Sequence, residues 1–179
     1  MAVVTFRRYC PDDAQQVGCL IADTYSQFNL TFAPPEERAL FLGPFQHARS
    51  PHEAHQEAIA RTIQAAIVFV AVEEKQVVGV LRGKSDQLQS LFVRADHHRQ
   101  GIGRQLVERF EEECRRQGSA EIRVRATVYA VPFYTAVGYK RTTGIRAMRS
   151  FDGTGLEYQP MKKVLRDGSK DRTRAPRAG

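Results

Sequence analysis

The chain has 179 residues, of which 42% are hydrophobic, 26% charged and 9% aromatic, and its formal net charge is +7. This length suits a single domain, and the composition is that of a folded globular protein rather than a disordered or fibrous one. The longest apolar run, Ala65–Val72, is far shorter than the roughly 20 residues of a membrane-spanning helix, so no membrane segment is expected. The N-terminus lacks the basic segment and apolar stretch of a secretory signal, and we expect a cytoplasmic protein.

Much of the positive charge lies in the last segment of the chain. Residues 166–179 carry five basic and two acidic residues, hence +3 of the net charge of +7. This segment has few apolar residues to bury, so we predict one domain over residues 1–165 and a disordered basic tail over residues 166–179. The body, at 7 − 3 = +4, favours an anionic ligand such as a phosphorylated cofactor. Nucleic-acid binding would rest mainly on the tail and is the less favoured interpretation.

The first half of the chain predicts a strand followed by helices. Residues 3–9 alternate enough for a strand. From a plausible N-cap at Asp12, apolar residues recur at three- and four-residue spacing as far as Phe28, which is typical of an amphipathic helix. Residues 31–49 are rich in proline and glycine and predict irregular structure with a short helical turn. A capping box with proline at residues 50–53 then predicts a helix that runs to about Gln64.

The second half predicts most of the sheet. Residues 67–72 and 77–81 form a hairpin, and residues 88–93 form a further strand. The next helix buries an apolar face, exposes a face that includes Glu111, and ends at Gly118. A strand around residues 122–124, a short helix at 130–137 and strands near 139–146 and 156–165 follow, with Pro160 at an irregular or edge position. Strands and helices mixed around one sheet indicate an α/β fold.

A strand, a glycine-bearing loop and a helix follow one another directly in residues 88–107. The first backbone N–H groups of a helix have no partners within it and can bind phosphate oxygens. Gly101 and Gly103 would let the main chain approach an anion closely, with Arg99 and Arg104 at the rim. The segment lacks the Lys-Ser/Thr of a nucleotide triphosphate loop and the third glycine of a dinucleotide fingerprint. A tight turn without a ligand is the alternative. The three cysteines have no metal-ligand spacing, so we expect no metal site.

Two segments resemble signatures of the Gcn5-related N-acetyltransferase (GNAT) superfamily. Residues 98–103 are similar to its pyrophosphate loop, Gln/Arg-x-x-Gly-x-Gly/Ala, except that His98 replaces the usual first residue. Residues 126–139 are similar to its second signature and keep Phe-Tyr-x-x-x-Gly-Tyr. The resemblance implies a mostly antiparallel central sheet that splays between the fourth and fifth strands and is flanked by helices. It also implies transfer of an acetyl group from acetyl-CoA, without a metal, to a primary amine of a small molecule or a protein.

The resemblance also implies roles for individual residues. Tyr134 would protonate the departing coenzyme A thiolate, although a core tyrosine is the alternative. The backbone of the fourth strand would bind the pantetheine arm, and the loop amides would bind the diphosphate. Thr127 would touch the cofactor arm or cap the following turn. The predicted cofactor-binding residues are therefore Leu91, Phe92, Val93, His98, Arg99, Gln100, Gly101, Ile102, Gly103, Arg104 and Thr127.

Several questions stay open at the level of sequence. The general base could be water, Asp86, Glu157 or a histidine. Three phenylalanines, Phe32, Phe41 and Phe45, either line an acceptor pocket or fix their loop to the core. A degenerate family member that senses acyl-CoA without turnover is the alternative function. The acceptor is unidentified, and a homodimer is considered by analogy with the family alone.

Overall fold

The computed structural model describes residues 3–165, so the predicted tail over residues 166–179 lies outside the described residues. The strands are β1 (Thr5–Arg8), β2 (Ile67–Glu73), β3 (Gln76–Lys84), β4 (Gln87–Val93), β5 (Glu121–Thr127), β6 (Lys140–Arg141), β7 (Arg146–Ser150) and β8 (Gly153–Val164). The helices are α1 (Ala14–Thr24), α2 (Arg38–Leu42), α3 (Glu53–Ile63), α4 (Ile102–Arg116) and α5 (Val131–Ala136). No helix within residues 3–165 is long and apolar enough to cross a membrane.

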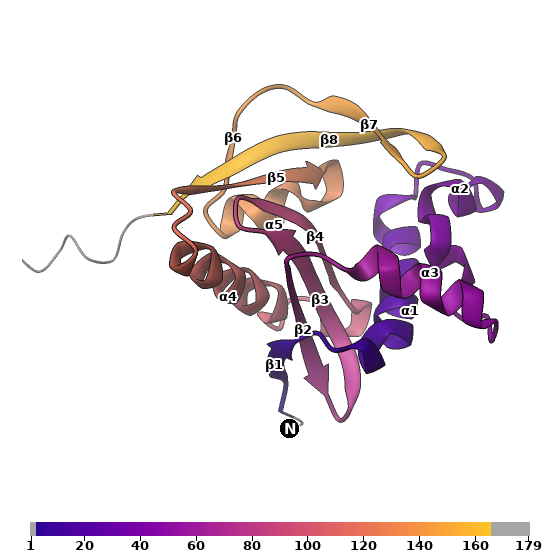
Figure 1. Cartoon of the computed structure of the whole chain (residues 1–179). Helices are drawn as coiled ribbons and strands as arrows, with labels where there is room; N and C mark the ends of the chain where they lie inside the picture. Colours follow the sequence, from indigo (N-terminus) through magenta and orange to yellow (C-terminus); the bar gives the residue numbers. More distant parts are fainter. Residues whose placement is uncertain (1–2, 166–179) are drawn as a thin grey trace, which may run out of the picture.

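All the strands join one eight-stranded sheet in the order β1-β2-β3-β4-β5-β8-β6, and β7 pairs with β8 (Figure 1). Every pairing is antiparallel except that of β4 with β5, which are parallel because α4 crosses between them. These two strands pair only through Gln87 with Arg123 and Leu88 with Val124. Beyond Leu88 they diverge. The predicted α/β fold, with a mostly antiparallel sheet that splays at this point, is confirmed.

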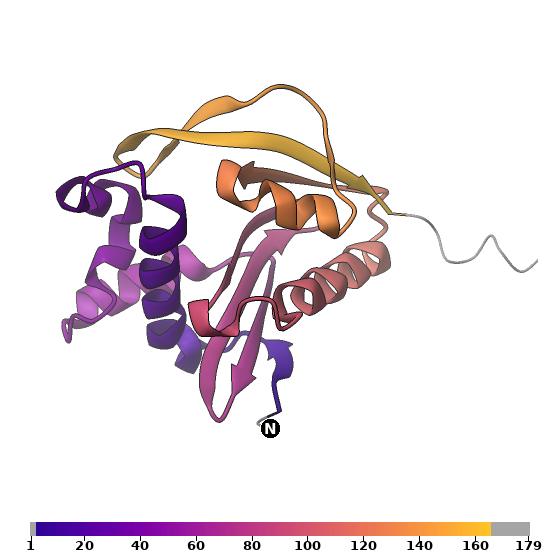
Figure 2. The same ribbon diagram turned by 180° about the vertical axis from the view of Figure 1, so that it is seen from behind.

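Helices cover both faces of the sheet (Figures 1 and 2). One face packs against α4 and α5 around Leu106, Phe110 and Ile122. The other face packs against α1, α2 and α3, where Ile21 and Ile59 are buried. The α4 helix is amphipathic as its spacing predicts, and it ends at Arg116, just before Gly118, whose φ of +83° suits glycine.

The structure corrects the prediction that Glu111 faces water. Glu111 is only 3% exposed, and both of its carboxylate oxygens accept hydrogen bonds from Lys163 Nζ at 2.8 Å. Lys163 Nζ also donates to the carbonyl of Val137 at 2.8 Å. The helical pattern alone could not reveal this, because the lysine comes from β8 and reaches α4 only through the folded sheet.

Segments of the first half are more helical than predicted. Within residues 31–49, α2 and two short 3-10 turns replace most of the expected irregular structure. Phe41 and Phe45 are buried there, whereas Phe32 is 54% exposed. The predicted capping box is wrong, because α3 begins at Glu53 and no side chain caps its first amides.

The C-terminal strands also differ from prediction. Within residues 139–145 only Lys140–Arg141 forms a strand, and Arg146 begins the additional strand β7. Pro160 lies in β8, which has neighbours on both sides, so of the two expected positions, irregular or edge, the edge position is wrong. The carbonyl of Pro160 accepts a hydrogen bond from Thr142 N–H at 3.0 Å, so its backbone faces the side of β6 and β7. Residues 142–145 form no strand there, and the missing N–H of proline therefore interrupts no ladder.

Candidate active site

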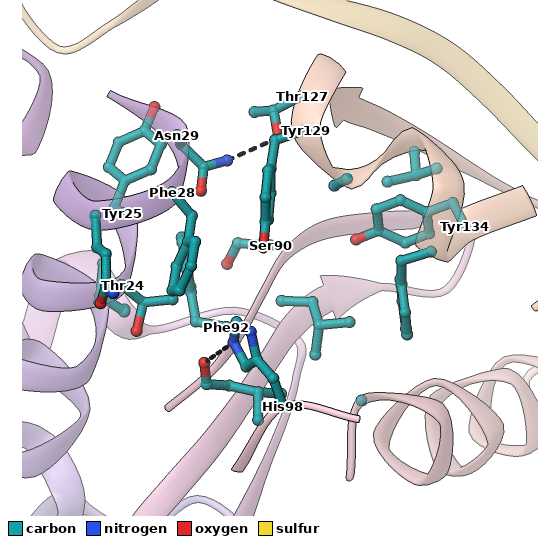
Figure 3. Close-up of a pocket in the computed structure, with 18 of the residues that line it drawn as sticks. Thr24, Tyr25, Phe28, Asn29, Ser90, Phe92, His98, Thr127, Tyr129 and Tyr134 are labelled. Atoms are coloured by element: carbon teal, nitrogen blue, oxygen red, sulfur yellow. Dashed lines mark hydrogen bonds between the residues drawn. The ribbon is translucent and has the colours of Figure 1, made fainter. Parts of the chain in front are cut away.

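A cavity of about 1060 Å³ opens where β4 and β5 separate (Figure 3). Its walls come from the C-terminal part of α1 and the turn after it, from β4, from the loop and first turn of α4, and from α5. It brings together Tyr134 and all the predicted cofactor-binding residues except Gln100. The exposed Gln100 side chain instead donates to the carbonyl of Asp96 at 2.9 Å.

The first turn of α4 presents unpaired amides to this cavity. The first bond around the turn is the one that Gln105 N–H donates to the carbonyl of Gly101 at 3.0 Å. The amides of the preceding residues have no carbonyl within the helix to bind. Gly101 has φ +82°, and a Cβ built on it would meet nothing within 4 Å. Open space thus lies beside the end of the helix that favours anions.

The second glycine of the loop is needed for a different reason. A Cβ on Gly103 would lie 3.1 Å from the ring of Phe133 and 3.8 Å from Leu91. Glycine therefore lets α4 pack closely against α5 at this point. The sequence predicted close approach at Gly103, but the neighbour that the structure shows is an aromatic ring of the second signature.

The edge of β4 offers main-chain groups to the cavity. Arg94 N–H donates to the carbonyl of Val78 on β3 at 2.9 Å. Because backbone groups alternate along a strand, those of Val93 and Leu91 face the opposite side, where β5 has diverged. His98 Nε2 contacts the carbonyl oxygen of Val93 at 2.7 Å and must donate to it. The N–H and C=O of Leu91 and the N–H of Val93 remain for a ligand.

A bridge of side chains crosses the cavity from the turn after α1 to the segment after β5. Asn29 Nδ2 donates to Thr127 Oγ1 at 2.7 Å. The ring of Phe28 stacks on Tyr129 at 5.3 Å between centroids and packs on His98 at 4.8 Å (Figure 3). The sequence spacing predicts Phe28 on the inner face of a regular helix and gives no role to Asn29 or Tyr129. A π-helical turn over Tyr25–Asn29 rotates this segment away from the expected spacing.

Tyr134 lies on the wall opposite this bridge. Its ring is buried and packs edge-on against Phe133 at 5.2 Å and Tyr139 at 5.5 Å. Figure 3 shows its hydroxyl directed into the cavity. Burial raises the pKa of Tyr134 above the ordinary value of 10.0, so the phenol keeps its proton at neutral pH.

The ionisable groups of the cavity are cations, histidines and tyrosines. No aspartate or glutamate of residues 3–165 lines it. Of the candidate bases, Asp86 lies near Lys84, 3.6 Å away, at the turn before β4, and Glu157 is exposed on β8. Over the same residues, no group of three or more potential ligands is arranged for a metal ion. The arginines that line the cavity are Arg82, Arg99, Arg104, Arg125 and Arg149.

His97 anchors the short turn that precedes the α4 loop. It is buried, and its ring nitrogens lie 2.8 Å from Glu73 Oε2 and 2.6 Å from Asp96 Oδ1. Burial acts to lower the pKa of His97, but the hydrogen bonds to the two carboxylates outweigh it and raise the pKa above 6.5. His97 therefore ties the loop to β2 through Glu73.

Comparisons with known proteins agree with this architecture. Residues 22–165 match the acetyltransferase (GNAT) domain family. A GCN5-related N-acetyltransferase from Rhodopseudomonas palustris superposes with a TM-score of 0.72 at 21% identity, over 92% of this chain and 98% of the other. PaiA N-acetyltransferase from Thermoplasma acidophilum, solved with coenzyme A, gives 0.66 at 15% identity over 91% and 99%. The putative acetyltransferase YncA from Salmonella typhimurium, solved with acetyl-CoA, gives 0.60 at 18% over 99% of both chains. No curated protein sequence matches significantly.

A sheet split at its parallel strand pair, with a helix N-terminus and a buried tyrosine at the split, defines an N-acyltransferase fold. The chain belongs to the acetyltransferase (GNAT) family, since the family match spans most of its length. Membership of this family makes the protein an acyltransferase. The family and the class of enzyme predicted from the two signatures are confirmed.

Proposed function

We propose that the protein transfers the acetyl group of acetyl-CoA directly to a primary amine. This proposal rests on one observation. The first amides of α4, the open edge of β4 and the hydroxyl of Tyr134 all face the same cavity. Two proteins of similar fold were solved with coenzyme A or acetyl-CoA, which supports the same use of this cavity here.

The chain offers a distinct group for each part of the cofactor. Amides from Gly101 to Arg104 would hold the diphosphate, because the helix N-terminus combines unpaired N–H groups with partial positive charge. Arg99 and Arg104 would add charge at the rim. The pantetheine arm would lie along the free backbone groups of Leu91 and Val93, between the diphosphate and Tyr134.

The reaction needs no acyl-enzyme. The amine nitrogen attacks the thioester carbonyl carbon, and the tetrahedral intermediate collapses as its C–S bond breaks. The Tyr134 hydroxyl would then donate a proton to the departing sulfur. Burial raises the pKa of the Tyr134 phenol above its ordinary value of 10.0, and the same desolvation makes the departing thiolate a stronger base than a hydrated thiolate, whose thiol has a pKa of about 8.5. The proton of the amine would leave through water or a histidine, since neither Asp86 nor Glu157 lines the cavity.

The test combines binding with turnover. Acetyl-CoA and coenzyme A should each raise the melting temperature, and thiol release should appear across part of a panel of primary amines. Tyr134→Phe should lower kcat about 100-fold or more without loss of acetyl-CoA binding, as expected for a general acid. Tyr9→Phe, outside the cavity, is the matched control. Absence of stabilisation by both ligands would refute the proposal, and stabilisation without turnover on any amine would support the acyl-CoA sensor instead.

A further inference from the structure

The cavity carries positive charge away from the first turn of α4 as well as beside it. None of its five arginines pairs with a carboxylate among residues 3–165. Arg99 and Arg104 stand beside the first turn of α4, where the diphosphate would bind. The other three are Arg82 on β3, Arg125 on β5 and Arg149 on β7, and they lie away from the proposed diphosphate site.

Arg82 is the most constrained of these three. Its Nε donates to the carbonyl of Ile63 at 2.8 Å, and its Nη2 donates to the carbonyl of Thr62. Both acceptors belong to the last turn of α3, which carries partial negative charge. Burial lowers the pKa of Arg82, as expected for a cation held without a carboxylate. Its Nη1 has no hydrogen-bond partner within the described part of the chain, which leaves a fixed donor for a ligand.

A second polar group faces the same space. Ser90 on β4 is paired directly opposite Arg82 on β3, so both side chains lie on one face of the sheet. Ser90 Oγ is buried and has no hydrogen-bond partner among the residues that the structure describes. A buried hydroxyl without a partner costs stability. Figure 3 shows Ser90 on the cavity wall near Phe92.

Apolar side chains also line this end of the cavity. Tyr25 packs edge-on against Phe92 at 5.8 Å, and Phe45 packs against Phe151 at 6.3 Å between ring centroids. All four line the cavity together with Met148. An acceptor that fits these walls has an apolar body and an anionic group for the arginine and the serine.

We infer that the acceptor is an amino acid, an amine that also carries a carboxylate, and that Arg82 and Ser90 recognise this carboxylate. The inference rests on the proposed function and names its substrate class. A polyamine would place several positive charges beside unpaired arginines, whereas an amino acid brings one negative charge to them. The carboxylate would complete the hydrogen bonding of Arg82 Nη1 and of Ser90 Oγ.

The test uses matched acceptors on the full chain with acetyl-CoA. Phenylalanine, 2-phenylethylamine and phenylalaninamide share one aromatic body and differ in the carboxylate. The wild-type protein should acetylate phenylalanine with a kcat/KM about 10- to 100-fold above that for the other two, which is the effect of one charge-assisted contact. Methionine and 3-(methylthio)propylamine form a second pair, and spermidine represents the polyamines.

Variants identify the group responsible. Arg82→Gln should raise KM for phenylalanine about 10- to 100-fold, with kcat and the acetyl-CoA affinity unchanged, and should leave 2-phenylethylamine unaffected. Arg82→Lys should restore part of the loss. Arg123→Gln is the control, because Arg123 lies on β5 outside the cavity and pairs with Glu121 at 2.8 Å.

The outcomes separate the two proposals. If the wild-type protein acetylates 2-phenylethylamine, phenylalaninamide or spermidine as well as phenylalanine or better, the proposed substrate class is wrong. This comparison uses the wild-type protein alone and does not depend on the folding of a variant. An unchanged KM for phenylalanine in a folded Arg82→Gln would overturn the role of Arg82. If the wild-type protein does not bind acetyl-CoA, the proposed function itself is refuted.

Discussion

Glycine at position 101 has two possible advantages, its left-handed backbone conformation and the open space beside it. Two substitutions at Gly101 test them separately. Gly101 has φ +82° and ψ −1°, and a Cβ there would meet nothing within 4 Å. Alanine in this left-handed conformation costs about 1–2 kcal/mol of folding free energy, with no steric clash to add to it. For a chain of this size that lowers Tm by about 2–8 °C. Asparagine adopts the conformation more readily, so Gly101→Asn should lose less stability than Gly101→Ala.

Binding of coenzyme A should follow the opposite order. The open space beside Gly101 is where the diphosphate would meet the amides of the first turn, so any side chain there intrudes on the ligand. Gly101→Asn carries the larger side chain and should lose more affinity than Gly101→Ala. A loss of about tenfold or more corresponds to about 1.4 kcal/mol of binding free energy. Stability and affinity would therefore rank the two variants differently.

Thermal unfolding without ligand and calorimetric titration with coenzyme A measure the two quantities. Pantetheine lacks the diphosphate and should bind all variants equally. Gly118→Ala is a matched control, because Gly118 has φ +83° at the other end of α4 and a Cβ there also meets nothing within 4 Å. It should lose stability like Gly101→Ala and keep the wild-type affinity. Wild-type affinity in Gly101→Asn would refute the placement of the diphosphate at this turn.

Two further predictions concern the buried ionisable side chains of Glu111 and His97. Glu111→Gln leaves Lys163 without its carboxylate and should cost about 3 kcal/mol, the lower end for a broken buried pair because the Lys163 side chain is 26% exposed. Tm should then fall by about 6–12 °C in calorimetry, and a loss below 2 °C would contradict the importance of the pair. The pKa of His97 is higher in the folded state than in the unfolded chain, so its contribution is complete below about pH 6.5 and is lost as pH rises through the folded value. Urea titrations at several pH values should show this loss, and His97→Gln should abolish that part of the pH dependence.

The features that the sequence predicted correctly depend on neighbours along the chain. A strand followed directly by a glycine-bearing helix start is local, and so is the alternation of Ile122 and Val124 with exposed residues on β5. Main-chain amides at a helix start need no particular side chain, so under the proposed binding of the diphosphate His98 can replace the usual first residue of the motif. The family and the splayed sheet followed from two such local signatures in the expected order.

The features that the sequence did not reveal depend on distant segments. Glu111 is buried because Lys163 lies 52 positions away in the chain and folds across α4. Asn29 meets Thr127 only because a π-helical turn closes over the separated strands. Arg82 occupies a position in β3 between Leu81 and Gly83 that carries no motif, and its place on the cavity wall appears only when α3 supplies the carbonyls that hold it.

The charge of the cavity also bears on the missing carboxylate base. An ammonium ion that enters a space lined by arginines without acidic partners is destabilised relative to the neutral amine, so its pKa falls. Each unit of this fall lowers the free energy of deprotonation by about 1.4 kcal/mol. On the proposed reaction, the arginines would thus do in part what a strand carboxylate would do, and a water molecule could accept the proton. Arg82 would then hold the acceptor's carboxylate, and the arginines of the cavity that stay unpaired would favour the neutral, nucleophilic amine.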